Sequence, residues 1–228
     1  MLQVPNSDPK SGPKSGLYYT NKFARIAILA YQEVMGTNGL NAILNMAGLK
    51  HLVNHYPPDD LEREFDFSDF TAIHIGLEEM VGLRGSRGLA LRAGRATFNN
   101  GLKGYGALAG VSDPAFKGLP HQTRLLLVLP VAARIFSSTT DQTTTVEETE
   151  DAFFWIIHRC PVCYSRKGMD QPACNMTTGM LQAMLTWVSG GLDYAVNESK
   201  CCATGDSVCK FIIQKEPVLS EPGVAEQS

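Results

Sequence analysis

Apolar residues recur at steps of three and four from Leu17 onward, which predicts helices that bury one face. Gly36 interrupts the first of these patterns, and a second one runs from Leu40 to Leu49. A third helix is predicted to open near Ser68 or Asp69, since either side chain could cap it. The first part of the chain is therefore predicted to be helical.

Residues 82–110 are rich in glycine and contain Gly85-Ser-Arg-Gly88, which invites comparison with a phosphate-binding loop. No predicted strand precedes this stretch, and the Gly-Lys-Ser/Thr end of such a loop is missing, so a nucleotide site is not expected. The stretch instead predicts a helix whose small residues let another element approach closely. These residues are Ala90, Ala93, Gly94 and Thr97.

The densest apolar run, Leu125-Leu-Leu-Val-Leu129, lies within residues 119–136 and is followed by Pro130. It is shorter than the ~18 residues that would suggest a membrane span, so it predicts a buried helix bent at Pro130. The N-terminus also lacks the continuous apolar region of a secretion signal. We therefore expect a cytoplasmic protein without a membrane span.

Strand-like patterns dominate the last third of the chain. Residues 143–158 predict a hairpin or one long bent strand, and residues 174–188 return to helical spacing until Gly190-Gly191 ends the helix. Two closing strands are predicted from residues that alternate inward, namely Leu192, Tyr194 and Val196, then Cys209, Phe211 and Ile213. Helices followed by strands predict an α+β fold with helices packed on one side of a small antiparallel sheet.

The 228-residue chain is long enough to bury a core without disulfides. Residues 1–16 and 217–228 hold few apolar groups and several prolines, so we expect both to be disordered tails around a single domain at residues 17–216. The net charge is −3. Acidic and basic residues are interspersed, and nucleic acid is therefore not expected as a direct partner.

A candidate metal site lies in the last third of the chain, which holds all six cysteines. Glu198 and Cys201 are three residues apart, and Gly205-Asp206 supplies a turn that can bring Cys209 beside both. With Cys174 from upstream, the set has three sulfurs and one carboxylate oxygen. Zinc accepts these ligands and takes four of them in a structural site. Burying the Glu198 carboxylate without a partner would cost free energy, whereas a bound cation would offset that cost.

The order Glu198-x-x-Cys201, Gly205-Asp206 and Cys209-Lys-Phe resembles the signature of the 4-vinyl reductase domain family, most specifically over residues 151–214. That family includes a protein linked to bacteriochlorophyll synthesis, archaeal proteins described as hydrocarbon-binding, and sensor domains of phenol-responsive bacterial regulators. The resemblance implies zinc ligands at Cys174, Glu198, Cys201 and Cys209. It also implies a fold similar to small trafficking-complex subunits and, distantly, to haem-based nitric oxide sensors, commonly in a homodimer.

Cys160-Pro-Val-Cys163 and Cys202 depart from the pattern of the sensors. The Cys-x-x-Cys spacing suits metal ligands or a redox pair. A thioredoxin-type role expects this motif at a helix start in a βαβ unit, whereas here it follows a predicted strand and leads into a polar loop. A rival metal set therefore stays open, formed by Cys160, Cys163, Cys201 and Cys209, although the resemblance favours the set with Cys174 and Glu198.

Apolar side chains that could line a ligand cavity occur on the predicted helix at residues 174–188, where three methionines form one stripe. Methionine is common both in ordinary cores and in adaptable apolar pockets. In the phenol sensors a tryptophan and a histidine hold the ligand hydroxyl, and the resemblance places their counterparts at Trp155 and at His121. The candidate ligand contacts are Trp155, Phe153, His121, Met180 and Met184.

The sequence thus predicts a zinc-stabilised domain that holds an apolar small molecule, such as an aromatic, a hydrocarbon or a tetrapyrrole. It would act as a sensor or carrier for a downstream signalling or biosynthetic protein. No Ser/His/Asp constellation or dinucleotide fingerprint is recognisable, so no catalytic residue is assigned. The resemblance also implies an alternative: an enzyme or accessory factor that reduces a vinyl group of a bacteriochlorophyll precursor. A thiol redox protein is a third alternative.

Overall fold

The computed structural model describes residues 13–105 and 113–218, with the side chains of 102–105 left aside. The elements of the first half are β1 (Tyr18–Thr20), α1 (Asn21–Met46), a 3-10 turn (Lys50–Leu52), β2 (Arg63–Asp66) and α2 (Phe67–Tyr105). Those of the second half are α3 (Pro114–Lys117), α4 (His121–Thr139), β3 (Thr144–Glu148), β4 (Ala152–Ile157), α5 (Asn175–Ser189), β5 (Tyr194–Lys200), a 3-10 turn (Cys202–Thr204) and β6 (Cys209–Pro217).

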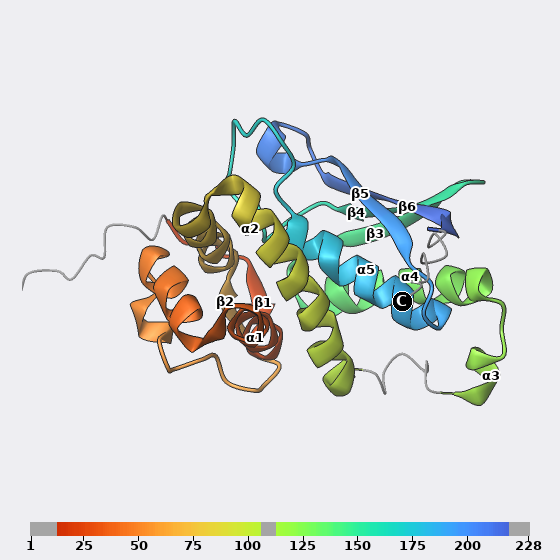
Figure 1. The fold of residues 1–228 in the computed structure, drawn as a ribbon, viewed down its shortest axis with the longest axis horizontal. Helices are drawn as coiled ribbons and strands as arrows, with labels where there is room; N and C mark the ends of the chain where they lie inside the picture. The colour runs from red at the N-terminus through yellow and green to blue at the C-terminus, as the bar shows by residue number, and fades with distance from the viewer. Residues whose placement is uncertain (1–12, 106–112, 219–228) are drawn as a thin grey trace, which may run out of the picture.

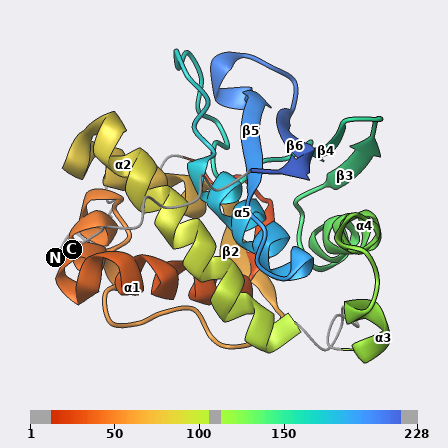
Figure 2. The same ribbon diagram turned by 45° about the vertical axis from the view of Figure 1, so that its right-hand side comes forward.

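Helices and strands occupy different parts of the molecule, as the α+β prediction requires. An antiparallel sheet with strand order β3-β4-β6-β5 lies at one side, and α4 and α5 run along one of its faces (Figure 1). Helix α2 contacts both α1 and α5, so it joins the N-terminal helices to the sheet-bearing part (Figure 2). The predicted α+β fold is confirmed, including the hairpin β3–β4 and the closing strands β5 and β6.

The inward face of the sheet follows the predicted alternation. Phe153, Trp155 and Ile157 of β4 are buried in the core, and they pair in register with Ile213, Phe211 and Cys209 of β6. Leu192 is the exception among the residues predicted to point inward, because it precedes β5 and is 39% exposed.

A second, two-stranded sheet formed by β1 and β2 was not predicted from the sequence. The pairing joins Tyr19 to Phe65, far apart in the chain, and the helix predicted from Leu17 begins only at Asn21. Thr20 caps that helix, because its side chain accepts a hydrogen bond from the amide of Phe23. Three-residue strands carry too little periodicity to be told from the start of a helix.

Both long helices are interrupted by a glycine in the left-handed region of backbone space. Gly36 in α1 has φ 74° and Gly82 in α2 has φ 72°. The predicted interruption at Gly36 is confirmed, whereas that at Gly82 was not foreseen. Helix α2 starts at Phe67, and the side chain of Asp66 accepts a hydrogen bond from the amide of Ser68. Asp66 therefore caps the helix, not Ser68 or Asp69 as predicted.

Helix α4 continues through Pro130 and is amphipathic rather than buried all round. Its inward side includes Leu125 and Leu129, but Leu126, Leu127 and Val131 are 42%, 49% and 42% exposed. The prediction of a buried helix is therefore wrong for its outer face. An unbroken apolar run conceals which of its residues face outward, since no polar position marks the solvent side.

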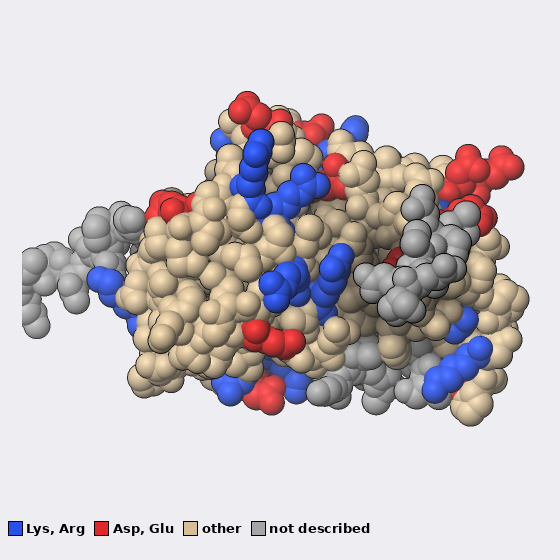
Figure 3. Space-filling model, in the orientation of Figure 1, with Lys and Arg blue, Asp and Glu red and all other residues tan. Residues whose placement is uncertain are grey.

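Within the described ranges, no helix is both long enough and apolar enough to cross a membrane. On the face shown in Figure 3, basic and acidic side chains are scattered among uncharged ones. The predicted tails lie mostly outside the described residues, as do residues 106–110 of the glycine-rich stretch.

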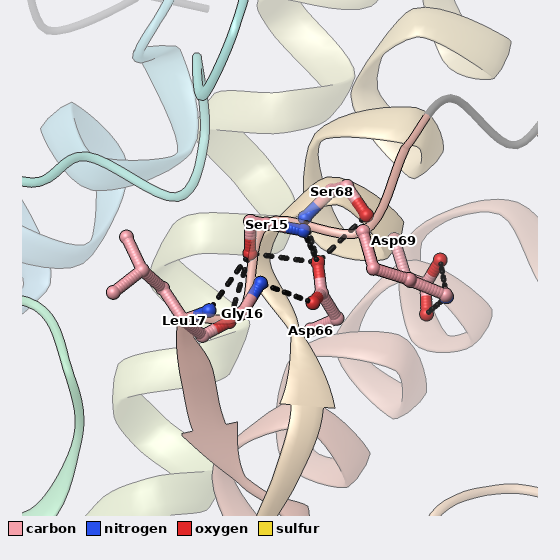
Figure 4. Close-up of polar contacts among 7 residues, drawn as sticks. Ser15, Gly16, Leu17, Asp66, Ser68 and Asp69 are labelled. Atoms are coloured by element: carbon pink, nitrogen blue, oxygen red, sulfur yellow. Dashed lines mark hydrogen bonds and ion pairs between the residues drawn. The ribbon is translucent and has the colours of Figure 1, made fainter.

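Lys14, Ser15 and Gly16, from the segment predicted to be a tail, are bound to the start of α2 (Figure 4). Asp66 accepts the Ser15 hydroxyl at 2.8 Å, the Gly16 amide at 3.1 Å and the Ser68 hydroxyl at 2.6 Å. Burial acts to raise the pKa of Asp66, but the hydrogen bonds from Ser68 and Ser15 outweigh it and lower this pKa to about 2. Asp66 is therefore an acceptor that fixes the chain before β1.

The helix expected to allow close approach of another element does so, and α5 is that element. A Cβ atom on Gly94 of α2 would lie 2.0 Å from the carbonyl oxygen of Met176, and one on Gly179 of α5 would lie 2.0 Å from that of Leu91. Both collisions are with backbone, which has little freedom to retreat. The absence of side chains at these two glycines is therefore what sets the α2–α5 distance.

Gly94→Ala should lower the free energy of unfolding by about 3 kcal/mol or more, because the added methyl overlaps the backbone of α5. Gly88→Ala is the matched control: it lies in the same helix, and a Cβ there meets nothing within 4 Å. That variant should be neutral or more stable by up to about 1 kcal/mol. Urea unfolding measures both, and equal stabilities of the two variants would contradict the close contact.

Asp66→Asn should lower the free energy of unfolding at neutral pH by about 1.5–3 kcal/mol, since hydrogen bonds to a charged acceptor are lost. Because the folded-state pKa lies below the ordinary 3.8, this stability is present above pH 3.8 and is lost as the pH falls toward 2. The difference between wild type and variant should shrink over that window. Asp59→Asn removes an exposed ion pair with Lys22 and is the control, which should lower the free energy of unfolding by less than about 1 kcal/mol. A constant difference for Asp66→Asn would argue against the depressed pKa.

Candidate metal centre

Five cysteines and one glutamate from four parts of the chain meet at the end of the large sheet. Cys160 and Cys163 lie in the irregular segment after β4, and Cys174 immediately precedes α5. The others come from the β5–β6 hairpin and are Glu198, Cys201 and Cys209. All five sulfurs are buried, whereas Cys202 is half-buried and lies outside the cluster.

The hairpin turn places its ligands as the sequence predicted. The chain reverses at Gly205, which has φ 103°, and the side chain of Asp206 accepts the amide of Cys201 at 2.9 Å. Glu198 lies opposite Phe211 in the β5–β6 ladder, so its side chain projects from the same end of the sheet as Cys209, the first residue of β6.

The predicted zinc ligands Cys174, Glu198, Cys201 and Cys209 are brought together. One ligand atom from each lies within 4.8 Å of every other. The Sγ atom of Cys174 is 3.9 Å from that of Cys201 and 3.8 Å from that of Cys209, and the last two are 4.0 Å apart. A tetrahedral zinc with Zn–S bonds of ~2.3 Å has sulfurs about 3.8 Å apart, so the three thiols fit such an ion.

Glu198 is the member of this group whose surroundings favour a cation most directly. Its Oε2 atom accepts the amide of Cys174 at 2.8 Å, whereas Oε1 is buried and has no hydrogen-bond partner among the described residues. Burial, together with the charge of Cys201, raises the pKa of Glu198 to about 8. A buried oxygen without a donor is costly, and a bound metal ion would remove that cost.

The thiols also influence one another. Hydrogen bonds with Cys163, Cys174 and Cys209 lower the pKa of the Cys201 thiol, while burial raises the pKa of the Cys174 thiol. Thiolates are the metal-binding form, so binding would release protons from this cluster.

A second group of four ligand atoms within 4.8 Å of one another consists of Cys160, Cys163, Cys174 and Cys209. Cys160 lies 3.5 Å from Cys174, and Cys163 lies 3.4 Å from Cys209, measured between Sγ atoms. This group differs from the rival set predicted from spacing in one member: it contains Cys174 instead of Cys201. Spacing in the sequence could not predict the fourth ligand, because Cys174 is brought to the cluster by the packing of distant segments.

Of the predicted ligand-contacting residues, Phe153, Trp155 and Met184 are buried in the core, whereas His121 and Met180 are half-buried. Phe153 and Trp155 are buried on β4, and the indole ring meets Phe136 of α4 edge-on at 6.0 Å between centroids. The Nε1 atom of Trp155 and the Nε2 atom of His121 are both buried without a hydrogen-bond partner among the described residues.

A cavity of about 20 Å³ lies between the N-terminal helices and α5. Met180, one of the predicted ligand contacts, lines it, together with Met176 and Thr177 of the same helix. Among the lining residues that sequence reasoning missed are Tyr19 and Gln142, whose side chains are joined by a 2.6 Å hydrogen bond. Tyr19 belongs to the unpredicted strand β1, so no pattern in the sequence signalled its position.

Residues 153–215 match the family model of the V4R domain, which confirms the resemblance to the 4-vinyl reductase domain family for this part of the chain. The match covers β4, α5 and the β5–β6 hairpin, and with them every candidate zinc ligand. No curated protein matches the chain in sequence.

Solved structures with a similar fold include those of H-NOX proteins. An Fe(II) unliganded H-NOX protein from K. algicida has a TM-score of 0.56 at 14% identity, covering 89% of this chain and 100% of that one. An oxygen-binding H-NOX domain related to soluble guanylate cyclases has a TM-score of 0.52 at 13% identity, covering 87% and 96%. An H-NOX protein from S. oneidensis has a TM-score of 0.51 at 12% identity, covering 85% and 98%. At these identities the likeness shows the fold alone.

Proposed function

We propose that this chain is a small-molecule sensor or carrier domain whose fold is held by a zinc ion bound to Cys174, Glu198, Cys201 and Cys209. The convergence of these four donors at one buried point carries the proposal, because one of them is a carboxylate oxygen with no other partner in the described structure. Thiolate and carboxylate donors suit zinc. The V4R match and the H-NOX-like fold support a ligand-sensing role.

The zinc ion would have a structural role, since four protein ligands leave no position for a water or substrate. It would tie the start of α5 to the β5–β6 hairpin. Without it, the hairpin would retain its ladder to β4, but its contact with Cys174 would depend on weak thiol interactions and on the hydrogen bond from the Cys174 amide to Glu198.

The ligand is proposed to be an apolar small molecule that carries a hydrogen-bond acceptor, such as a phenol. Two observations support this class: Trp155 Nε1 and His121 Nε2 are buried and unpartnered among the described residues, and Met176 and Met180 line the cavity described above. The cavity has room for about one water molecule, so binding would require side chains such as Met180 to move. Methionine is suited to such rearrangement.

A homodimer and a downstream partner protein remain part of the proposal through the family resemblance. The outer face of α4 presents Leu126, Leu127 and Val131 and offers apolar area for a contact between two copies.

Cys209→Ser should lower both zinc content and thermal stability, because a hydroxyl is a poor zinc ligand and the hairpin loses its anchor. A loss of several kcal/mol corresponds to a melting temperature lower by roughly 10 °C. Elemental analysis and calorimetry measure the two effects. Cys202→Ser is the control and should match wild type, since Cys202 lies outside both groups of ligands. A zinc-free wild type with unchanged stability would refute the proposed zinc.

Trp155→Phe should weaken binding of phenol by about fivefold, because one buried hydrogen bond contributes about 1 kcal/mol. Binding of toluene, which lacks the hydroxyl but has a similar shape, should change much less. Isothermal titration of both probes against wild type and variant makes this comparison. Equal losses for both probes would mean that the indole acts by packing alone, and no binding of either probe would remove this ligand class while leaving the zinc proposal intact. Turnover of a divinyl tetrapyrrole with an added reductant would instead favour vinyl reduction.

A further inference from the structure

We propose that the cluster holds two divalent metal ions that share the thiolates of Cys174 and Cys209. One ion is the zinc of the proposed function, with Glu198 and Cys201 as its remaining ligands. The other is bound by Cys160 and Cys163 together with the shared pair. The inference rests on the proposed function for the first ion and adds a second site to it.

The two groups of four ligand atoms overlap in two members. In each group the four ligand atoms all lie within 4.8 Å of one another, and the common members are Cys174 and Cys209. The Sγ atoms of this pair are 3.8 Å apart, close to the sulfur separation of about 3.8 Å around a tetrahedral zinc. The pair can therefore form an edge that belongs to two tetrahedra at once.

Each shared sulfur contacts ligands of both groups. Cys174 Sγ lies 3.5 Å from Cys160 and 3.9 Å from Cys201. Cys209 Sγ lies 3.4 Å from Cys163 and 4.0 Å from Cys201. A thiolate sulfur has more than one lone pair, so it can bind two metal ions without gaining a second charge.

Charge balance permits the second ion. A single zinc in the Cys174 group would leave the buried thiols of Cys160 and Cys163 within 3.5 Å of ligated sulfurs with no cation of their own. Two added thiolates and one added divalent ion leave the net charge of the centre unchanged. The second ion therefore adds ligands to a buried site without adding buried charge.

The segment that supplies the additional ligands lies outside regular secondary structure. Cys163 and Cys201 would belong to different ions, so their present Sγ separation of 3.9 Å would increase. Cys160 and Cys163 lie between β4 and α5, outside helix and strand, and can move without breaking the sheet ladder. The Thr71 hydroxyl donates to the carbonyl of Pro161 at 2.6 Å and keeps the motif against α2.

Native mass spectrometry of the full chain, purified with zinc present, counts the ions directly. Wild type and Cys202→Ser should each carry two zinc ions, and the double variant Cys160→Ser/Cys163→Ser should carry one. The double variant retains the complete Cys174, Glu198, Cys201 and Cys209 group and is expected to fold. One ion in wild type, unchanged in the double variant, would overturn the second site and leave the proposed function standing. A metal-free wild type would refute both.

A second measurement needs no variant. Wild type loaded with ¹¹³Cd should give two cadmium resonances coupled to each other through the shared sulfurs. A single resonance, or two without coupling, would overturn the shared-thiolate centre even if two ions were counted.

Discussion

The contact between the backbones of α2 and α5 determines where the rest of the structure can lie. Gly94 and Gly179 leave no room for a side chain at the crossing, so α5 is held at a fixed depth against the N-terminal helices. Because α5 also lies along the sheet, the start of this helix is close to the β5–β6 hairpin (Figure 2). Cys174 immediately precedes α5, so the position of the helix brings this cysteine to the other ligands.

Packing alone does not account for the chemistry that gathers at the end of α5. Five thiols form an acceptable apolar core, since free cysteine is commonly buried. Glu198 does not fit that description: its Oε1 atom is buried without a donor in the described structure. Either the carboxyl keeps its proton, which its raised pKa permits, or a cation binds there. The three sulfurs lie 3.8 to 4.0 Å from one another, a spacing that fits a bound metal ion, and this favours the cation.

Much of the centre could be predicted from the sequence because its ligands are local. Glu198, Cys201 and Cys209 lie on one hairpin, and the turn at Gly205 was readable from residue type. The hairpin β3–β4, the helix ending at Gly190 and the interruption at Gly36 were readable for the same reason. Tyr19, β1 and the sharing of Cys174 between two ligand groups were not, since each depends on contacts between distant segments. The outer face of α4 was misjudged because an all-apolar run has no polar marker of its solvent side.

The metal centre and the cavity are connected through the same short stretches of chain. Met176, Thr177 and Met180 line the cavity from α5, which Cys174 precedes, and Val162 lines it from between Cys160 and Cys163. A ligand larger than the present volume must displace some of these residues, and metal bonds to the neighbouring cysteines would oppose that displacement. Ions at the cluster would thus set how far the cavity can open, and a ligand that opens it would change the geometry at the shared sulfurs. Such a coupling is reciprocal: metal binding would change the affinity of the cavity for its ligand by the same factor by which the ligand changes the affinity of the cluster for metal.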